Sequence, residues 1–480
     1  MGVDPSQSRQ PTASVTGSET RSPSGGLERH FGLFQATALN VTMIVGAGVF
    51  ITIPLMLQVL PGPYALLGWL GAGALILVDG LIWSELGAAM PGSGGSYLYL
   101  LECYGRERFG RLMAFLFIWQ FLISGPLEVA SGLIAISQFS NALSPAFADF
   151  NDEWTIKRVL GTWGDDKLIV SVSPSGLACL LLGAGLIALL YRRITVLGKL
   201  TVTFWLGVMG ISGWILVDGA LRFDPHVAFN LPQSAPDLRT GLGAAMILAM
   251  YSYLGYYNVC YIGDEVRDPA RTIPRAVLLS ALLVCLLFTG LHLAMLGTVP
   301  WRLALDSKNL PSDFMRQIHG DWAATLVGVL LIWSCLGSVF AALLGYSRIP
   351  YGAARYGHFF APLARVHSVH HIPHVSLLLV GGLTLFWSFF DLGSVINALI
   401  TTRILEQFVG QVVGVVVWRR REPNAPRPYK MWLYPLPCAV ALGGWLYLYV
   451  SAGPLFILLG LATLACGLVA FVVWSARTGG

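Results

Sequence analysis

NVTMIVGAGVFITIPL, residues 40–55, is the stretch on which the predicted fold depends. It is mostly apolar, yet Gly46-Ala47-Gly48 lies in its middle, and glycine costs about 1 kcal/mol relative to alanine inside a helix. A second apolar stretch, residues 241–266, contains Leu254-Gly255-Tyr256 in the corresponding place. Backbone groups freed by a broken helix are costly in lipid unless they line a cavity. The sequence therefore predicts two membrane helices, the first and the sixth, that are unwound at mid-membrane.

A single glycine has a simpler interpretation, because small residues also allow close helix packing in membranes. The two triplets, however, lie in the first helix of each of two consecutive five-helix sets, residues 31–221 and 241–418. This arrangement is typical of transporters built from inverted repeats. As a corresponding pair, the glycines favour a binding site.

The composition indicates an integral membrane protein. Of the 480 residues, 55% are hydrophobic and only 11% are charged, whereas a soluble domain would be far more charged. The first 30 residues are rich in Ser, Pro, Thr and Gly and predict a disordered cytoplasmic tail. No polar linker divides the rest, so residues 31–476 are expected to form one membrane domain.

Twelve apolar runs approach or exceed the roughly 20 residues that cross a bilayer, so we expect an all-α protein with ten helices in the two repeats and two more in residues 432–476. The expected spans are 31–59, 63–90, 109–142, 169–191, 194–221, 241–266, 275–298, 320–354, 374–391, 392–418, 432–452 and 454–476. The ninth and tenth are divided at Asp391-Leu392-Gly393, because one continuous helix would be too long.

Cations gather in alternate loops, which sets the expected orientation. They are Arg106, Arg108, Arg111, Arg192, Arg193, Arg267, Arg271, Arg275, Arg355, Arg365, Arg419, Arg420, Arg421, Arg427 and Lys430. The other loops carry mainly Asp and Glu. The positive-inside rule then places both termini in the cytoplasm, in a plasma or inner membrane.

Several function classes lack a motif in this sequence. No nucleophile–base pair, nucleotide-binding loop or metal motif is recognisable, so neither an enzyme nor a cofactor is expected. The net charge of +5 gives no indication of nucleic acid, and the seven cysteines, in or beside apolar stretches, are interpreted as small core residues. His367, His370, His371 and His374 lie in a cytoplasmic loop without a matching Cys or acidic set and are interpreted as a polar joint, not a metal site.

Seven short motifs occur in a fixed order along the chain. They are Gly46-Ala47-Gly48-Val49-Phe50, Ser84-Glu85-Leu86-Gly87, Pro91-Gly92-Ser93-Gly94-Gly95-Ser96-Tyr97, Leu101-Glu102-Cys103-Tyr104-Gly105, Gly263-Asp264-Glu265-Val266-Arg267-Asp268-Pro269, Ile273-Pro274-Arg275 and Arg427-Pro428-Tyr429. In this order and spacing they resemble the amino acid–polyamine–organocation superfamily, and within it the L-type amino acid transporter branch and related bacterial permeases. The resemblance covers nearly the whole chain after the tail.

The resemblance implies a leucine-transporter-like fold and a site at the two broken helices. Amide groups at the first break, in Val45, Gly46, Ala47, Gly48 and Val49, would bind the substrate carboxylate, since a helix N-terminus favours anions. Carbonyl groups at the second break, near Tyr251, Ser252, Tyr253, Leu254 and Gly255, would bind the ammonium group. Tyr251 occupies the place of an aromatic gate in the family, and Tyr256 is a further candidate for the cavity wall.

Two buried charges have alternative interpretations. The resemblance places Lys199 where its ammonium group takes the position of a sodium ion in sodium-coupled relatives, but a lysine near a helix end also snorkels to the interface. Glu128, near the middle of the third helix, has three possible functions: contact with a cationic substrate, carriage of a coupling proton, or pairing with a structural donor such as a tyrosine.

Three other acids receive different interpretations. Nothing in the sequence indicates that Asp79 faces the cavity. Glu406 is spaced i, i+3 from Arg403, so these two side chains are expected to pair with each other. Glu265 belongs to the family's Glu-Val-x-x-Pro signature and is expected to hold the inner gate by pairing with an arginine of the cytoplasmic loops.

The leading hypothesis is a secondary active transporter or exchanger that moves amino acids by alternating access, proton-linked or ion-independent rather than sodium-coupled. The alternatives are a polyamine or cationic-solute permease with Glu128 as its chief ligand, and a non-transporting sensor on the same fold. Animal L-type members attach a heavy chain through a cysteine after the third helix. Residues 144–167 contain no cysteine, so no disulfide-linked partner is expected.

Overall fold

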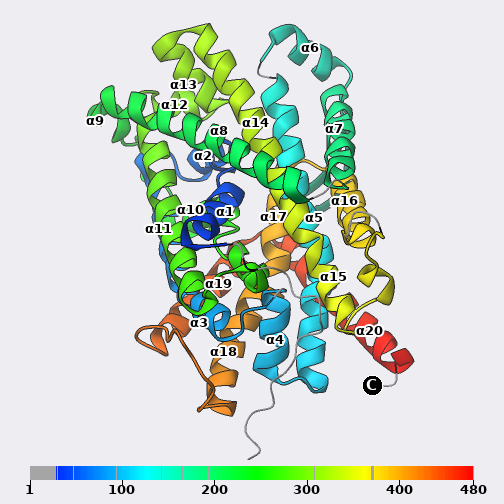
Figure 1. The fold of residues 1–480 in the computed structure, drawn as a ribbon. Coiled ribbons are helices and arrows are strands. Elements are labelled where there is room, and N and C mark those ends of the chain that lie inside the picture. The colour runs from blue at the N-terminus through cyan, green and yellow to red at the C-terminus, as the bar shows by residue number, and fades with distance from the viewer. Residues whose placement is uncertain are drawn as a thin grey trace, which may run out of the picture.

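Helices build most of the chain in the computed structural model, which describes residues 29, 31–46, 48–92, 94–141, 143–163, 166–191, 194–307, 309–368 and 372–478. The first half contains α1 (Leu33–Ile44), α2 (Gly48–Val59), α3 (Ala65–Ala89), α4 (Ser96–Tyr104), α5 (Arg108–Asn141), α6 (Pro145–Glu153), β1 (Ile156–Trp163), β2 (Asp166–Val172), α7 (Pro174–Leu190), α8 (Ile194–Leu221) and α9 (Pro225–Ala228). Figure 1 shows these helices in one bundle, with α6 at the upper end and α4 toward the lower end.

The second half continues the same bundle. It contains α10 (Leu238–Tyr253), α11 (Pro269–Leu296), α12 (Trp301–Ala304), α13 (Leu310–His319), α14 (Asp321–Tyr346), α15 (Arg348–Arg355), α16 (His374–Trp387), α17 (Leu392–Arg403), the π-helix η5 (Ile404–Val409), α18 (Gly410–Arg421), α19 (Leu436–Ser451) and α20 (Pro454–Thr478). Short 3-10 turns, η1 to η4, lie at Gly62–Tyr64, Asn258–Tyr261, Gly263–Glu265 and Ala361–Ala364.

Both predicted interruptions lie at the glycines that indicated them. α1 ends at Ile44 and α2 begins at Gly48, and the two helices are bent by 47°. α10 ends at Tyr253, and Gly255 has a φ of +109°, a backbone conformation that favours glycine. Residues 258–265 then form 3-10 turns instead of continuing the α-helix.

The four half-helices cross-pair around the interruptions. α2 packs against α10, and α1 packs against the 3-10 turn at Asn258–Tyr261 that follows the second interruption. The segment before one break therefore contacts the segment after the other. Helices α3, α5, α11 and α14 enclose this centre, since α3 packs on α10 and α11, and α5 packs on α14 and α17.

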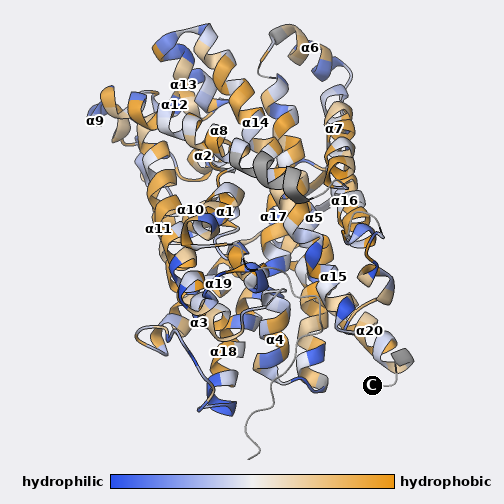
Figure 2. Ribbon diagram, in the orientation of Figure 1, coloured by the Kyte–Doolittle hydropathy of each residue, from blue (hydrophilic) through white to orange (hydrophobic). Residues whose placement is uncertain are grey.

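Apolar helices of spanning length dominate the described part of the chain. Seven helices are long and apolar enough to cross a membrane, and the bent pair α1 and α2 raises this number to eight. Three shorter apolar helices, α7, α16 and α19, add to them. Figure 2 shows hydrophobic residues along most helices and hydrophilic residues toward the two ends, for example at α13 above and at the end of α18 below.

Two boundaries test the expected spans closely. The division at Asp391 is confirmed: α16 ends at Trp387, α17 begins at Leu392, and the Asp391 carboxylate accepts a hydrogen bond from the Ser394 amide at 2.9 Å. The expected start at residue 169 is wrong, because Ser173 caps α7 and Pro174 occupies its first turn.

An antiparallel hairpin, β1 with β2, corrects the expectation of an all-α chain. The strands pair Ile156 with Val172, and Gly164-Asp165, residue types common in turns, separate them in the sequence. β2 contains the β-branched residues Ile169, Val170 and Val172, which favour a strand. The chain is thus predominantly helical, and residues 1–28, where most of the predicted tail falls, lie outside the described residues.

Candidate functional site

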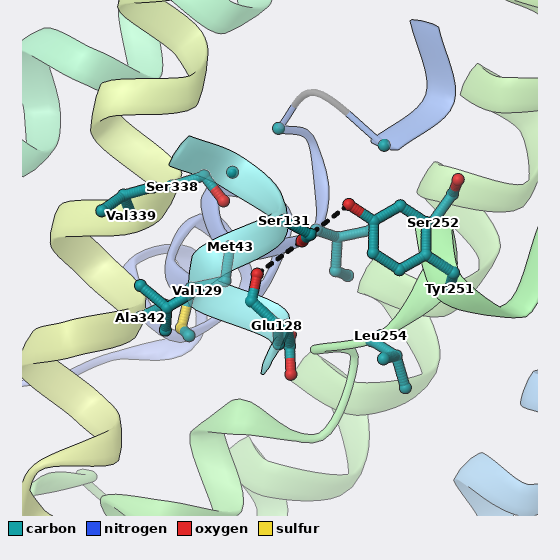
Figure 3. Close-up of a pocket in the computed structure, with 14 residues that line it drawn as sticks. Met43, Glu128, Val129, Ser131, Tyr251, Ser252, Leu254, Ser338, Val339 and Ala342 are labelled. Atoms are coloured by element: carbon teal, nitrogen blue, oxygen red, sulfur yellow. Dashed lines mark hydrogen bonds between the residues drawn. The ribbon is translucent and has the colours of Figure 1, made fainter. Parts of the chain in front are cut away.

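A cavity of about 40 Å³ lies where the two interrupted helices meet α5 and α14 (Figure 3). Its lining comes from α1 and α2 at the first break, from α10 at the second, and from the middle of α5 and α14. The lining residues are Met43, Ile44, Gly46, Gly48, Glu128, Val129, Ser131, Gly132, Tyr251, Ser252, Leu254, Ser338, Val339 and Ala342. Six of the residues predicted from the sequence are among them: Gly46, Gly48, Glu128, Tyr251, Ser252 and Leu254.

The two glycines of the first break are closely faced by serines. A Cβ atom at Gly46 would lie 2.8 Å from Ser338 Oγ, and one at Gly48 would lie 3.2 Å from the Ser252 backbone and hydroxyl. Both approaches are tighter than an ordinary van der Waals contact, so larger side chains would fill the cavity. Ser252 also shares a hydrogen bond of 3.0 Å with Thr52 of α2, which ties the two interrupted helices together.

The helix ends at the breaks supply complementary backbone groups. The N-terminus of a helix leaves its first N–H groups without intrahelical partners, and the C-terminus leaves its last carbonyl groups. α2 begins and α10 ends beside the cavity. The cavity is therefore bordered by one helix end with partial positive charge and one with partial negative charge. Ala47 lies outside the described residues.

Tyr251 closes one wall of the cavity. Its hydroxyl donates a hydrogen bond of 2.8 Å to Ser131 Oγ, and Ser131 donates one of 2.6 Å to the Glu128 carbonyl (Figure 3). The aromatic ring of the second interrupted helix is thereby tied to α5 directly across the cavity. The gate function expected of Tyr251 stays a prediction.

Glu128 does not stand alone at the cavity. Its Oε2 atom accepts a hydrogen bond of 2.6 Å from the Tyr346 hydroxyl and lies 2.6 Å from Nη1 of Arg403. Arg403 also donates to Ser124 Oγ at 3.1 Å and to the Tyr257 hydroxyl at 3.2 Å. The carboxylate therefore has a buried cationic partner.

This arrangement corrects the expected Arg403–Glu406 pair. In an α-helix, residues at i and i+3 lie on one face, but the π-helix η5 begins at Ile404, directly after Arg403, and changes the turn. Arg403 instead pairs with Glu128 from α5. A contact between residues so far apart in the sequence leaves no periodic signal, so the sequence pattern did not predict it.

Five predicted positions are not among the residues that line the cavity. Tyr253 stacks on Phe288, with ring centroids 5.5 Å apart, and Tyr256 donates its hydroxyl to Asp79. Asp79 also accepts a hydrogen bond from Trp445 at 3.2 Å. Tyr256 and Asp79 thus connect the second break to α3 and α19. Val45, Val49 and Gly255 flank the breaks but are not among the lining residues.

Asn40 is a residue that the sequence analysis missed. Its amide donates to the Tyr256 carbonyl at 2.7 Å, and its carbonyl accepts from the Val259 amide at 2.9 Å. One buried side chain of α1 thus satisfies two backbone groups of the unwound segment after α10. The available signal was a polar amide in an apolar helix, which usually requires a buried partner.

The remaining candidates lie outside the cavity lining. Glu265 interacts electrostatically with Arg348 at the start of α15, and its carbonyl accepts a hydrogen bond of 3.0 Å from the Phe31 amide. Lys199 belongs to α8, but its side chain is outside the part that the structure describes. Of the predicted histidine cluster, His370 and His371 lie outside the described residues, which contain no group of three potential metal ligands.

Comparison with known proteins decides the family. A family model described as amino acid permease matches residues 31–475. This chain belongs to the amino acid permease family. The permease is 28% identical to the human cystine/glutamate transporter over 85% of this chain and 77% of that protein. It is 25% identical to the serine/threonine exchanger SteT of Bacillus subtilis, over 92% and 94% of the two chains.

A third relative is also named as an amino acid transporter. The large neutral amino acids transporter small subunit 2 of Mus musculus is 27% identical over 97% of this chain and 86% of the relative. The family and these relatives are transporters, not enzymes. The permease is accordingly a multi-pass membrane protein, as its apolar helices indicate.

Proposed function

We propose that this permease transports or exchanges amino acids by alternating access around the cavity between the two interrupted helices. The observation that carries the proposal is the meeting of an α2 N-terminus and an α10 C-terminus at one cavity. Relatives whose names specify amino acid transport or exchange support the substrate class.

The backbone recognises what all amino acids share. The substrate carboxylate accepts hydrogen bonds from amide groups near Gly46, Ala47 and Gly48, with Val45 and Val49 shaping the break. The ammonium group donates to carbonyl groups at the end of α10, in residues 251–255. Tyr251 moves with substrate entry, and its hydrogen bond to Ser131 supports a closed position.

The proposed architecture is leucine-transporter-like, with twelve spans in two inverted repeats, residues 31–221 and 241–418, and two helices in residues 432–476. The eight long spans, three shorter apolar helices and interrupted α10 support this number. The cross-pairing of α2 with α10, and of α1 with the turn after α10, supports the inverted relation. Both termini lie in the cytoplasm in this proposal, and the membrane is the plasma or inner membrane.

Transport is proposed to be proton-linked or ion-independent, with Lys199 in place of sodium. Glu265 holds the inner gate through cytoplasmic arginines, and its favourable electrostatic interaction with Arg348 supports that assignment. Glu128 is assigned first to structure, because Tyr346 and Arg403 both bind its carboxylate. A polyamine permease is disfavoured, since the carboxylate that would bind the cation already has a cationic partner.

Counterflow in proteoliposomes tests the proposal. Vesicles loaded with one unlabelled amino acid from a panel, including cystine, serine and leucine, are expected to accumulate the labelled form of that amino acid, whereas vesicles loaded with spermidine are not. Empty vesicles and vesicles without protein are the controls. Ligand-induced thermal stabilisation without any flux would identify a sensor and refute transport. Flux of spermidine alone would establish the polyamine alternative.

A further inference from the structure

A second cavity lies at the end of α18, on the side of the bundle opposite α6 and α13 (Figure 1). Its volume is about 480 Å³, and it is lined by Val416, Arg419, Arg420, Pro423, Arg427, Tyr434 and Pro435. Figure 2 shows that hydrophilic residues gather at this end of α18 and in the segment that follows. Three of the lining side chains are guanidinium groups, so the cavity is strongly basic.

Only one of these arginines is neutralised within the described residues. Arg419 donates two hydrogen bonds to the buried Glu85 carboxylate, one of them of 2.7 Å. Neither Arg420 nor Arg427 has a carboxylate partner in that part of the chain, because the nearby Glu422 pairs with Arg421. The cavity therefore retains two uncompensated positive charges.

Contacts within the protein fix the Arg427 side chain, but not every N–H group of its guanidinium group has a hydrogen-bond partner among the described residues. Its Nη2 atom donates to the Glu422 carbonyl at 2.9 Å, and the group lies 5.3 Å above the Trp418 ring. Its buried Nε atom has no hydrogen-bond partner among the described residues. A buried donor without a partner is unfavourable, so an acceptor in the cavity would stabilise this side chain.

An apolar face continues from the mouth of the cavity along α19. Trp432 and Leu433 are 69% and 77% exposed, and Leu433 adopts a φ of +55° that is unusual for a residue with a side chain. From Leu436 the exposed residues of α19 recur at helical spacing: Leu436, Ala439, Val440, Gly443, Leu446, Tyr447 and Val450. The basic cavity thus lies at one end of an apolar stripe.

We propose that this cavity binds the headgroup of an anionic phospholipid. The phosphate accepts hydrogen bonds from Arg420 and Arg427, and the acyl chains lie along the exposed face of α19. The arrangement has what an amphipathic lipid requires: fixed guanidinium donors for a phosphate and a continuous apolar surface beside them. The bound lipid would join α18 and α19, the helices that flank the cavity.

Native mass spectrometry of the full-length purified permease tests this site with defined lipids. Wild-type protein titrated with dioleoyl phosphatidylglycerol is expected to retain it, and to retain dioleoyl phosphatidylcholine far less. Replacing Arg420→Gln and Arg427→Gln together should weaken apparent affinity for phosphatidylglycerol roughly 30-fold, about fivefold for each cation near the membrane surface. Arg355→Gln with Arg365→Gln, two exposed arginines outside the cavity, removes the same charge and should change retention less than twofold.

Arg420→Gln alone keeps the test open if the double variant does not fold, because Arg420 is exposed and forms no hydrogen bond or ion pair among the described residues. It should weaken retention about fivefold. Equal retention of the two lipids by wild-type protein, or equal loss in the control pair, would overturn the proposal. Competition by millimolar inorganic phosphate as effective as added phosphatidylglycerol would also overturn it, since it would identify a small-anion site.

Discussion

The structure makes a quantitative prediction about the ion pair between Glu128 and Arg403. Arg403 is 1% exposed, and Glu128 supplies the carboxylate of its ion pair. Glu128→Gln removes the negative charge and leaves the guanidinium buried without compensation. Breaking one partner of a buried pair costs about 3–5 kcal/mol. We therefore expect a loss of that size in the free energy of unfolding, whether or not Glu128 also contacts substrate.

A double-mutant cycle separates this cost from other effects of the substitution. Adding Arg403→Gln to Glu128→Gln removes both charges, so the double variant should be more stable than the sum of the single losses predicts, by more than about 1 kcal/mol. Unfolding in mixed detergent micelles containing increasing sodium dodecyl sulfate measures each free energy. The control is Glu102→Gln, whose partner Arg106 is 76% exposed and whose ion pair should contribute less than about 1 kcal/mol.

Two results would refute the reasoning. A Glu128→Gln variant as stable as the Glu102→Gln control would show that Arg403 does not depend on the carboxylate. Strict additivity in the cycle would show that the two side chains are uncoupled. If stability falls as expected and the pH dependence of uptake remains, Glu128 is structural; if the pH dependence disappears, it also carries the coupling proton.

Three further predictions concern the breaks and the coupling ion. Gly46→Leu should weaken ligand affinity, measured by thermal stabilisation, more than tenfold, because even a Cβ atom would lie 2.8 Å from a serine hydroxyl of α14. The control is Gly210→Leu, where an added Cβ atom meets nothing within 4 Å and affinity should stay normal. Equal affinities of the two variants would remove Gly46 from the site. Asn40→Ala should lower the free energy of unfolding by about 1–3 kcal/mol, since two buried backbone groups lose their partner. The control is Asn397→Ala, whose side-chain hydrogen bond to the Gly393 carbonyl is solvent-exposed; similar losses would contradict this assignment. Uptake should persist in sodium-free buffer, and Lys199→Ala should reduce flux more than equilibrium binding; strict sodium dependence would exclude the proposed ion substitution.

Local sequence signals predicted the elements that depend on local chemistry. The breaks at Gly46 and Gly255 followed from glycine in apolar helices, and the boundary at Asp391 followed from the length of a span. Hydropathy alone could not locate the start of α7. The apolar residues of β2 continue the hydrophobic run that precedes Pro174, and only the Ser173-Pro174 cap marks where the strand ends and the helix begins.

Contacts between residues that are distant in the sequence could not be predicted from local sequence patterns. Arg403 meets Glu128 because α17 packs on α5, and nothing in either helix specifies that register. Asn40 presents the same difficulty, since its partners are backbone groups that become available only where α10 unwinds. The π-helix η5 separates Arg403 from Glu406, and the amino-acid composition of this segment does not indicate a π-helix.

The pairing of Glu128 with Arg403 bears on what the proposed site recognises. With the carboxylate compensated, the charges offered to a ligand come mainly from the helix ends, partially positive at α2 and partially negative at α10. An amino acid zwitterion matches both ends, with its carboxylate at one and its ammonium group at the other. A polyamine carries no group for the α2 amides and would bring uncompensated positive charge toward Arg403. The same backbone arrangement that accepts amino acids with different side chains therefore disfavours a cation that lacks a carboxylate.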